Sequence, residues 1–123
     1  MATRAALSVP AHEAEVIEAV GAKYKLTPEQ LKLLYAIRLA ENGKTGREFG
    51  VLAPEAMRFA NNPELSFPTQ AAWAAGTIKK RYTGDLQAFA KRWAPIGVAN
   101  DPNNLNQNWV KNVQYYMGDS NGG

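Results

Sequence analysis

Glu41 is the residue of this sequence best placed to do acid chemistry. It follows a largely apolar stretch, Leu31 to Leu39, and precedes Asn42 and Gly43, of which Gly43 can take the left-handed conformation that ends a helix. A carboxyl at the end of a buried helix lies near a low-dielectric core and the negative end of the helix dipole, and both favour its protonated form. A protonated carboxyl can act as a general acid on a leaving oxygen. The alternative is a solvated side chain in a last helical turn.

A second carboxylate would decide the mechanism, because acid-catalysed glycoside cleavage commonly uses two. The candidates are Glu48, seven residues further on, and Asp101, in a turn before a proline. Glu48 could instead pair with Lys44 or Arg47, and Asp101 could simply stabilise its turn. If neither acts, a one-carboxylate mechanism remains, in which an N-acetyl or hydroxyl group of the substrate attacks.

Aromatic and amide side chains provide the groups that a sugar-binding site would use. Aromatic faces pack against sugar rings, and amides bond to N-acetyl groups. We expect Trp73 in the core. The residues predicted to bind substrate are Asn42, Phe49, Gly50, Trp93, Asn108 and Trp109.

Composition excludes several other chemistries. The sequence has no cysteine, so disulfides and thiolate metal sites are excluded, and its one histidine, His12, argues against His-based metal sites and Ser/His/Asp triads; we expect no metal and no cofactor. The net charge of +3 suits an anionic polymer. The basic residues of 79–81 and 91–92 would bind wall polymer or nucleic-acid phosphates, or form a solvated helix face.

The segments that must position these residues are predicted to be helices. Thr27, Pro28 and Gln30 form a capping-box pattern that predicts a helix over 28–41. We therefore expect an all-α, compact, single domain over 10–117, with a flexible arm at 1–9 and a flexible tail at 118–123. A minor hairpin is allowed at 49–52. Further helices are predicted over 10–23, 54–60, 68–82, 85–93 and 106–117.

Several short motifs occur in an order that resembles the lysozyme-like superfamily, in particular bacterial and phage glucosaminidase and lytic transglycosylase domains. Asn42 stands where those families usually have Ser, and the loop lacks the Gln of the transglycosylases. The resemblance implies a helical domain that cuts β-1,4 links of peptidoglycan glycan strands with Glu41 as the general acid, and it leaves the bond specificity open. The motifs are Glu41-Asn42-Gly43, Phe49-Gly50-Val51, Gln70-Ala71-Ala72-Trp73, Gly84-Asp85-Leu86 and Asn108-Trp109-Val110.

Two other functions stay open. The chain could be an inactive lysozyme-like structural component of a virion, with other virion proteins as partners. It could also be a small basic DNA-binding protein, because the predicted last helix carries Asn108, Lys111 and Asn112. The sequence predicts no membrane span, and its first residues lack the apolar region of a secretory signal. We therefore expect a phage protein that acts from the virion or is made in the host cytoplasm and delivered to the wall.

Overall fold

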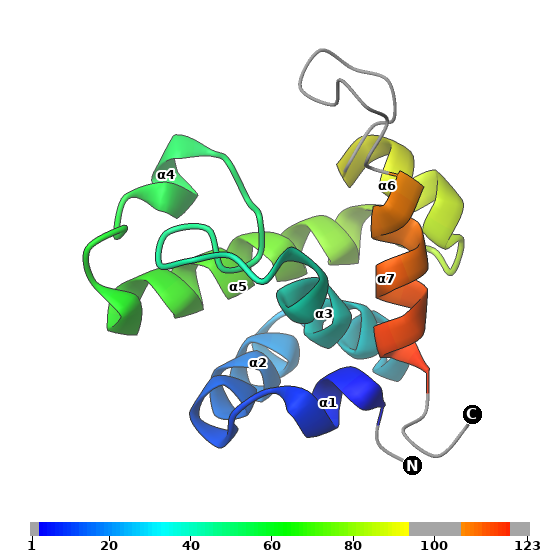
Figure 1. The fold of residues 1–123 in the computed structure, drawn as a ribbon, viewed down its shortest axis with the longest axis horizontal. Helices are drawn as coiled ribbons and strands as arrows, with labels where there is room; N and C mark the ends of the chain where they lie inside the picture. The colour runs from blue at the N-terminus through cyan, green and yellow to red at the C-terminus, as the bar shows by residue number, and fades with distance from the viewer. Residues whose placement is uncertain (1–2, 94–106, 119–123) are drawn as a thin grey trace.

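The protein folds into an all-α, compact, single domain, as predicted (Figure 1). The computed structural model describes residues 3–93 and 107–118. Within these ranges there is no strand, and the predicted hairpin at 49–52 is wrong, because this segment consists of turns and extended chain. None of the described helices is long and apolar enough to cross a membrane. The helices are α1 (Arg4–Ser8), α2 (Ala11–Lys23), α3 (Pro28–Glu41), α4 (Pro54–Met57), α5 (Pro63–Arg81), α6 (Leu86–Trp93) and α7 (Gln107–Met117).

Helix α3 lies at the centre of the domain. It begins at the predicted capping box, in which the Gln30 amide N–H donates to Thr27 Oγ1 at 3.1 Å and the Thr27 amide N–H donates to Gln30 Oε1 at 2.9 Å. The five consecutive residues from Leu33 to Ile37 are all buried, so the helix has no solvent-facing side over this stretch. Helices α1, α2, α5 and α7 pack around it (Figure 1).

Helix α5 begins earlier than predicted. The sequence indicated a start at Pro68, but the helix begins five residues earlier, at Pro63, and Asn62 caps it by accepting hydrogen bonds from the backbone N–H groups of Glu64 and Leu65. Pro68 therefore lies inside the helix, where it lacks the N–H that would bond to Glu64. The helix continues through it, and its apolar face, which includes Phe67, is buried against the core.

The predicted flexible arm is wrong for residues 3–9, which form α1 and its two flanking residues. Thr3 Oγ1 accepts a hydrogen bond from the Ala6 backbone N–H and so caps this short helix. Ala5 and Val9 are buried in the core, and this burial holds the segment against α3. The Arg4 N–H also donates to the Gly118 carbonyl at 2.8 Å, which joins the start of the domain to the end of α7. The other residues of the predicted tail, 119–123, lie outside the described residues.

Tyr35 makes stability sensitive to alkaline pH. Tyr35 is a buried residue of α3, and its hydroxyl donates to Glu18 Oε2 of α2 at 2.6 Å; burial first, and then the Glu18 carboxylate, raise the Tyr35 pKa well above its usual 10.0. Above pH 10 the unfolded chain therefore ionises Tyr35 while the folded chain keeps the proton. We expect the free energy of unfolding to fall there, at up to about 1.4 kcal/mol per pH unit from this group.

Tyr35→Phe should remove this contribution, so that urea unfolding between pH 8 and 11 shows a shallower loss of stability than in the wild type. Tyr115→Phe, on an exposed ring, is the matched control and should keep the wild-type slope. Equal slopes for Tyr35→Phe and the wild type would contradict the assignment.

Candidate active site

Side chains from three helices meet at the Glu41 carboxylate. Its Oε2 atom accepts a hydrogen bond from Trp109 Nε1 at 2.7 Å and another from Trp93 Nε1 at 3.2 Å. Glu41 ends α3, Trp93 ends α6 and Trp109 lies in the first turns of α7. The structure thus brings together three of the predicted site residues, which are far apart in sequence.

A stack of aromatic rings fixes the direction of the two indole N–H groups. The rings of Trp93 and Trp109 lie 6.2 Å apart, and Phe89 stacks on them at 5.6 and 6.3 Å. The Tyr82 ring meets Phe89 edge-on at 5.7 Å. Trp109 is only 8% exposed. It therefore has no free ring face to offer a sugar, and its predicted role in substrate binding is wrong. Its contact with the site is the hydrogen bond that its N–H donates to Glu41. Trp93 is partly exposed.

The other oxygen of the Glu41 carboxylate lies against Gly50. A Cβ atom on Gly50 would sit 2.4 Å from both Oε1 and Cδ of Glu41, which no real contact allows. Gly50 also has φ of +72°, a conformation that disfavours other residues. The loop of Phe49, Gly50 and Val51 can therefore lie against Glu41 because only glycine at position 50 leaves space for the carboxylate.

The turn after Glu41 is made by a different residue from the one predicted. Asn42, not Gly43, takes the left-handed conformation that ends α3, with φ 46° and ψ 41°. Asn tolerates this conformation better than most residues. Gly43 is needed for another reason: a Cβ there would lie 1.7 Å from the carbonyl oxygen of Arg47, where the loop folds back on itself. Asn42 is exposed, beside the carboxylate.

Gln70 holds the loop that carries Gly50. This side chain is fully buried. Its Oε1 accepts from the N–H groups of Phe49 and Val51, both at 3.2 Å, and its Nε2 donates toward the carbonyl oxygens of Gly46, Val51 and Ala56 at 3.0–3.1 Å. The backbone on both sides of Gly50 is thus bonded to one amide. Sequence reasoning gave Gln70 no role, although a polar residue three positions from Phe67, on the core-facing side of the helix, was the available signal.

Glu48 has a structural role that differs from both of its predicted ones. It is 4% exposed, and its Oε1 accepts from Ser66 Oγ at 2.7 Å and from the Gly46 N–H at 3.0 Å. These bonds tie the loop to α5. Glu48 is therefore neither a free second carboxylate nor the partner of Lys44 or Arg47.

Arg38 secures the same loop from α3, one turn before Glu41. Its guanidinium donates to the carbonyl oxygens of Gly43 and Glu48, both at 3.3 Å. It also forms an ion pair with Glu13, at 2.9 Å, in which both side chains are largely buried. The loop is thus held by side chains of α3 and α5 together.

The remaining predicted site residues differ in whether the structure leaves them accessible to a substrate. Phe49 is fully buried and packs on Phe67, with ring centroids 5.2 Å apart, so the prediction that it lines a cleft is wrong. Asn108 is exposed on α7, next to Trp109. Asp101 lies outside the described residues. Across the described part of the chain, no three acidic or histidine side chains gather where they could share a metal ion.

Gly50→Ala tests the packing at the carboxylate. We expect the new methyl group to displace the Glu41 side chain and break its bonds to Trp93 and Trp109, which would shift both indole N–H resonances in NMR spectra. Gly84→Ala is the matched control, because Gly84 also has a positive φ, +106°, but a Cβ there meets nothing within 4 Å. Unchanged indole resonances in Gly50→Ala would rule out the close contact.

Gln70→Leu tests the loop anchor. Leucine has a similar volume but leaves several buried backbone groups without partners, so we expect a loss of about 3 kcal/mol or more in the free energy of unfolding, measured with urea. Gln87→Leu, at an exposed position of α6, should change it by less than about 0.5 kcal/mol. Similar losses in the two variants would show that the Gln70 bonds contribute little.

Comparisons with known proteins give no further identification: no family model, no curated protein and no solved structure matches this chain. The likeness to the lysozyme-like superfamily therefore depends on the sequence motifs. The functional argument depends on the geometry around Glu41.

Proposed function

We propose that this chain is a peptidoglycan-cutting glycosidase with Glu41 as its general acid, acting on β-1,4 links of the bacterial wall glycan. The observation that carries the proposal is the pair of indole N–H groups that converge on one oxygen of a partly exposed carboxylate. An acid catalyst must hold its proton in a fixed direction relative to the leaving oxygen. Bonds from two helices, stiffened by stacked aromatic rings, supply that fixed direction.

The same bonds indicate which oxygen would carry the proton. Oε2 of Glu41 already accepts two hydrogen bonds, so a proton on the carboxyl group belongs on Oε1. Oε1 is the atom beside Gly50, which has no side chain of its own. In the proposed reaction, Oε1 gives its proton to the glycosidic oxygen as the bond from that oxygen to the anomeric carbon breaks.

The attacking group would come from the substrate. Glu48 is bonded to Ser66 and Gly46 and supports the loop, so a one-carboxylate mechanism is the better fit to the candidates that the structure describes. An N-acetyl oxygen or a hydroxyl of the sugar would bond to the anomeric carbon. With a hydroxyl, its proton passes to the Glu41 carboxylate, which restores the acid and leaves an anhydro product.

A structural role for the same fold is the second candidate, and one observation favours it. Two part-buried indole N–H groups need acceptors, and Glu41 accepts from both of them whether or not it donates a proton in a reaction. A virion component that kept this arrangement for stability would have the same geometry and no cutting activity.

Glu41→Gln separates these two functions. The glutamine carbonyl can still accept from both indoles, so the fold should persist, but the amide cannot serve as the acid. We expect wild-type protein to release soluble fragments from purified peptidoglycan and Glu41→Gln to be at least about a hundredfold slower. Mass spectrometry of the fragments would identify the bond by its ends: anhydro-muramic, reducing muramic or reducing glucosamine.

Two controls sharpen this test. Glu55→Gln, on the exposed surface of α4, should cut like the wild type. Glu48→Gln can keep its loop contacts and should also cut, whereas a folded but inactive Glu48→Gln would restore the two-carboxylate mechanism. If Glu41→Gln still cuts peptidoglycan, Glu41 is not the general acid. If the wild type releases no fragments from several wall types, the structural role is favoured.

A further inference from the structure

A groove of about 550 Å³ runs along the outer face of α5. The residues of α5 that line it lie on the side of the helix away from the core-facing residues Phe67, Ala71, Ala74 and Ile78. Glu41, Trp93 and Trp109 do not take part in it. The groove is therefore a second surface, distinct from the candidate active site, and the proposed catalytic role of Glu41 does not account for it.

Trp73 forms one wall of this groove. The sequence predicted it in the core, but its side chain is 42% exposed, since α5 turns its alanine-rich face inward and Trp73 outward. Tyr24 lies on the other side of the groove, near Gly76, where a Cβ would be 3.6 Å from the Tyr24 ring. The small residues Ala72 and Gly76 line the space between. An exposed indole beside a hollow lined by small residues suits a flat ring that packs on its face.

Two hydroxyl groups give the groove hydrogen-bond acceptors. Thr69 Oγ1 donates to the Leu65 carbonyl at 2.8 Å, and Thr77 Oγ1 donates to the Trp73 carbonyl at 3.1 Å. Each hydroxyl has a single hydrogen, which is used within the helix, so only its lone pairs remain for a ligand. Sugar hydroxyls can donate to such acceptors, whereas phosphodiester oxygens cannot.

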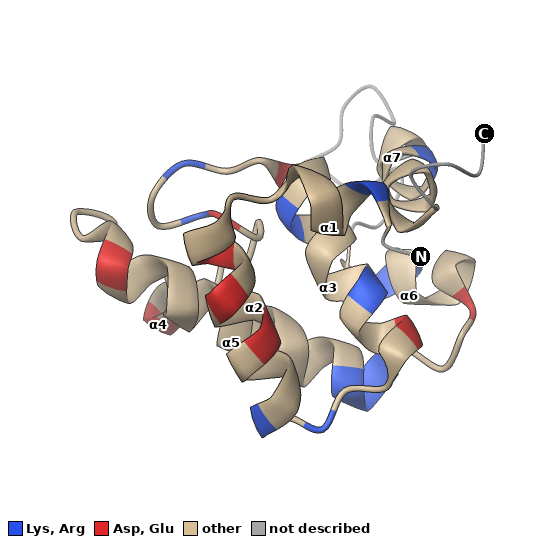
Figure 2. Cartoon of the chain, turned by 90° about the horizontal axis from the view of Figure 1, so that it is seen from below, with Lys and Arg blue, Asp and Glu red and all other residues tan. Residues whose placement is uncertain are grey.

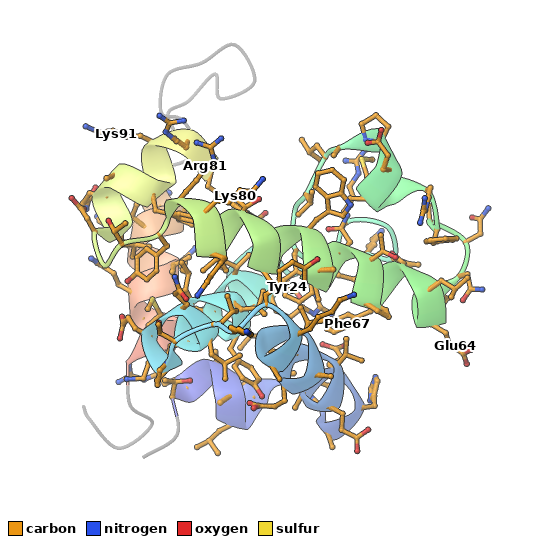
Figure 3. All side chains as sticks on the ribbon, turned by 180° about the vertical axis from the view of Figure 1, so that it is seen from behind. Tyr24, Glu64, Phe67, Lys80, Arg81 and Lys91 are labelled. Carbon is orange, nitrogen blue, oxygen red and sulfur yellow. The ribbon has the colours of Figure 1, made fainter. Side chains whose placement is uncertain are left out.

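The charged residues that line the groove are all basic. Arg58 and Lys80 are exposed there, and no Asp or Glu lines it. Lys80 and Arg81 are in the last turn of α5, and Lys91 is on α6, the next helix (Figure 3). Further basic residues gather at this end of α5, where Lys79 Nζ bonds to the Lys25 carbonyl (Figure 2). The ligand should therefore carry negative charge.

We propose that this groove binds an acidic glycan chain, with a sugar ring against Trp73 and carboxylate groups at Arg58 and Lys80. Single-stranded nucleic acid would also use an aromatic ring and cations. The phosphodiester groups of single-stranded DNA, however, have no hydrogen to donate to Thr69 and Thr77. The glycan fits all three kinds of group that the groove presents.

The test is a binding titration with three probes: a hexamer of galacturonic acid, the neutral hexamer of N-acetylglucosamine, and a thymidine oligonucleotide. It uses the wild type and Glu41→Gln, which should bind the acidic hexamer equally well, so that a failure of the proposed catalysis does not affect the result. Trp73→Ala and Lys80→Gln should each weaken binding by about tenfold. The matched controls are Leu65→Ala and Lys111→Gln, which are exposed outside the groove and should bind like the parent.

Several outcomes would overturn the proposal. These are absence of binding to the acidic hexamer, equal binding of the neutral hexamer, tighter binding of the oligonucleotide, or binding that neither Trp73→Ala nor Lys80→Gln weakens. Both replaced side chains are exposed, and circular dichroism would confirm that each variant is folded.

Discussion

The burial of α3 on every side is the constraint on which the rest of the structure depends. A helix that is apolar around most of its circumference is stable only when other elements enclose it. Here α1, α2, α5 and α7 do so, and only the two ends of α3 reach the surface. The end that carries Glu41 is thereby placed at the edge of the core, within reach of α6 and α7. The position of the carboxylate is thus a consequence of how the core is filled.

The long segment between α3 and α5 has little secondary structure, so its backbone needs other hydrogen-bond partners. Gln70, Glu48 and Arg38 supply them from buried or largely buried positions. Among the described side chains, no buried nitrogen or oxygen atom is left without a partner. Such a network is stable only when it is complete, since a buried polar group without a partner costs free energy. This completeness fixes Gly50 against Glu41.

Helix α5 separates two surfaces of different character. On its inner side, Gln70 accepts hydrogen bonds from the backbone N–H groups of Phe49 and Val51 and so supports the loop beside Glu41. Its outer side presents an exposed indole, hydroxyl acceptors and cations. Under the function proposed above, a second contact with a long polymer would strengthen binding, because two linked contacts bind more tightly than either alone. Each surface can be tested without the other.

The sequence by itself determined the elements whose signals are local. The capping box at Thr27, the helix after Pro10 and the end of α3 at Glu41 all follow from residues a few positions apart, and the structure confirms them. Glu41, Gly50 and Trp109 were named as site residues through the family resemblance, and Trp93 only as an aromatic residue that could bind sugar, since no local pattern links residues so far apart.

The tertiary structure alone decided which side chains face inward. It placed α1 in the core, buried Phe49 and Glu48, and turned Trp73 outward. The partners of Gln70 lie 14 to 24 residues away along the chain, so its role could not be read from its neighbours. The physical reason is that burial and hydrogen-bond completion depend on which distant segments meet, whereas caps and periodicity depend on the chain within one or two turns.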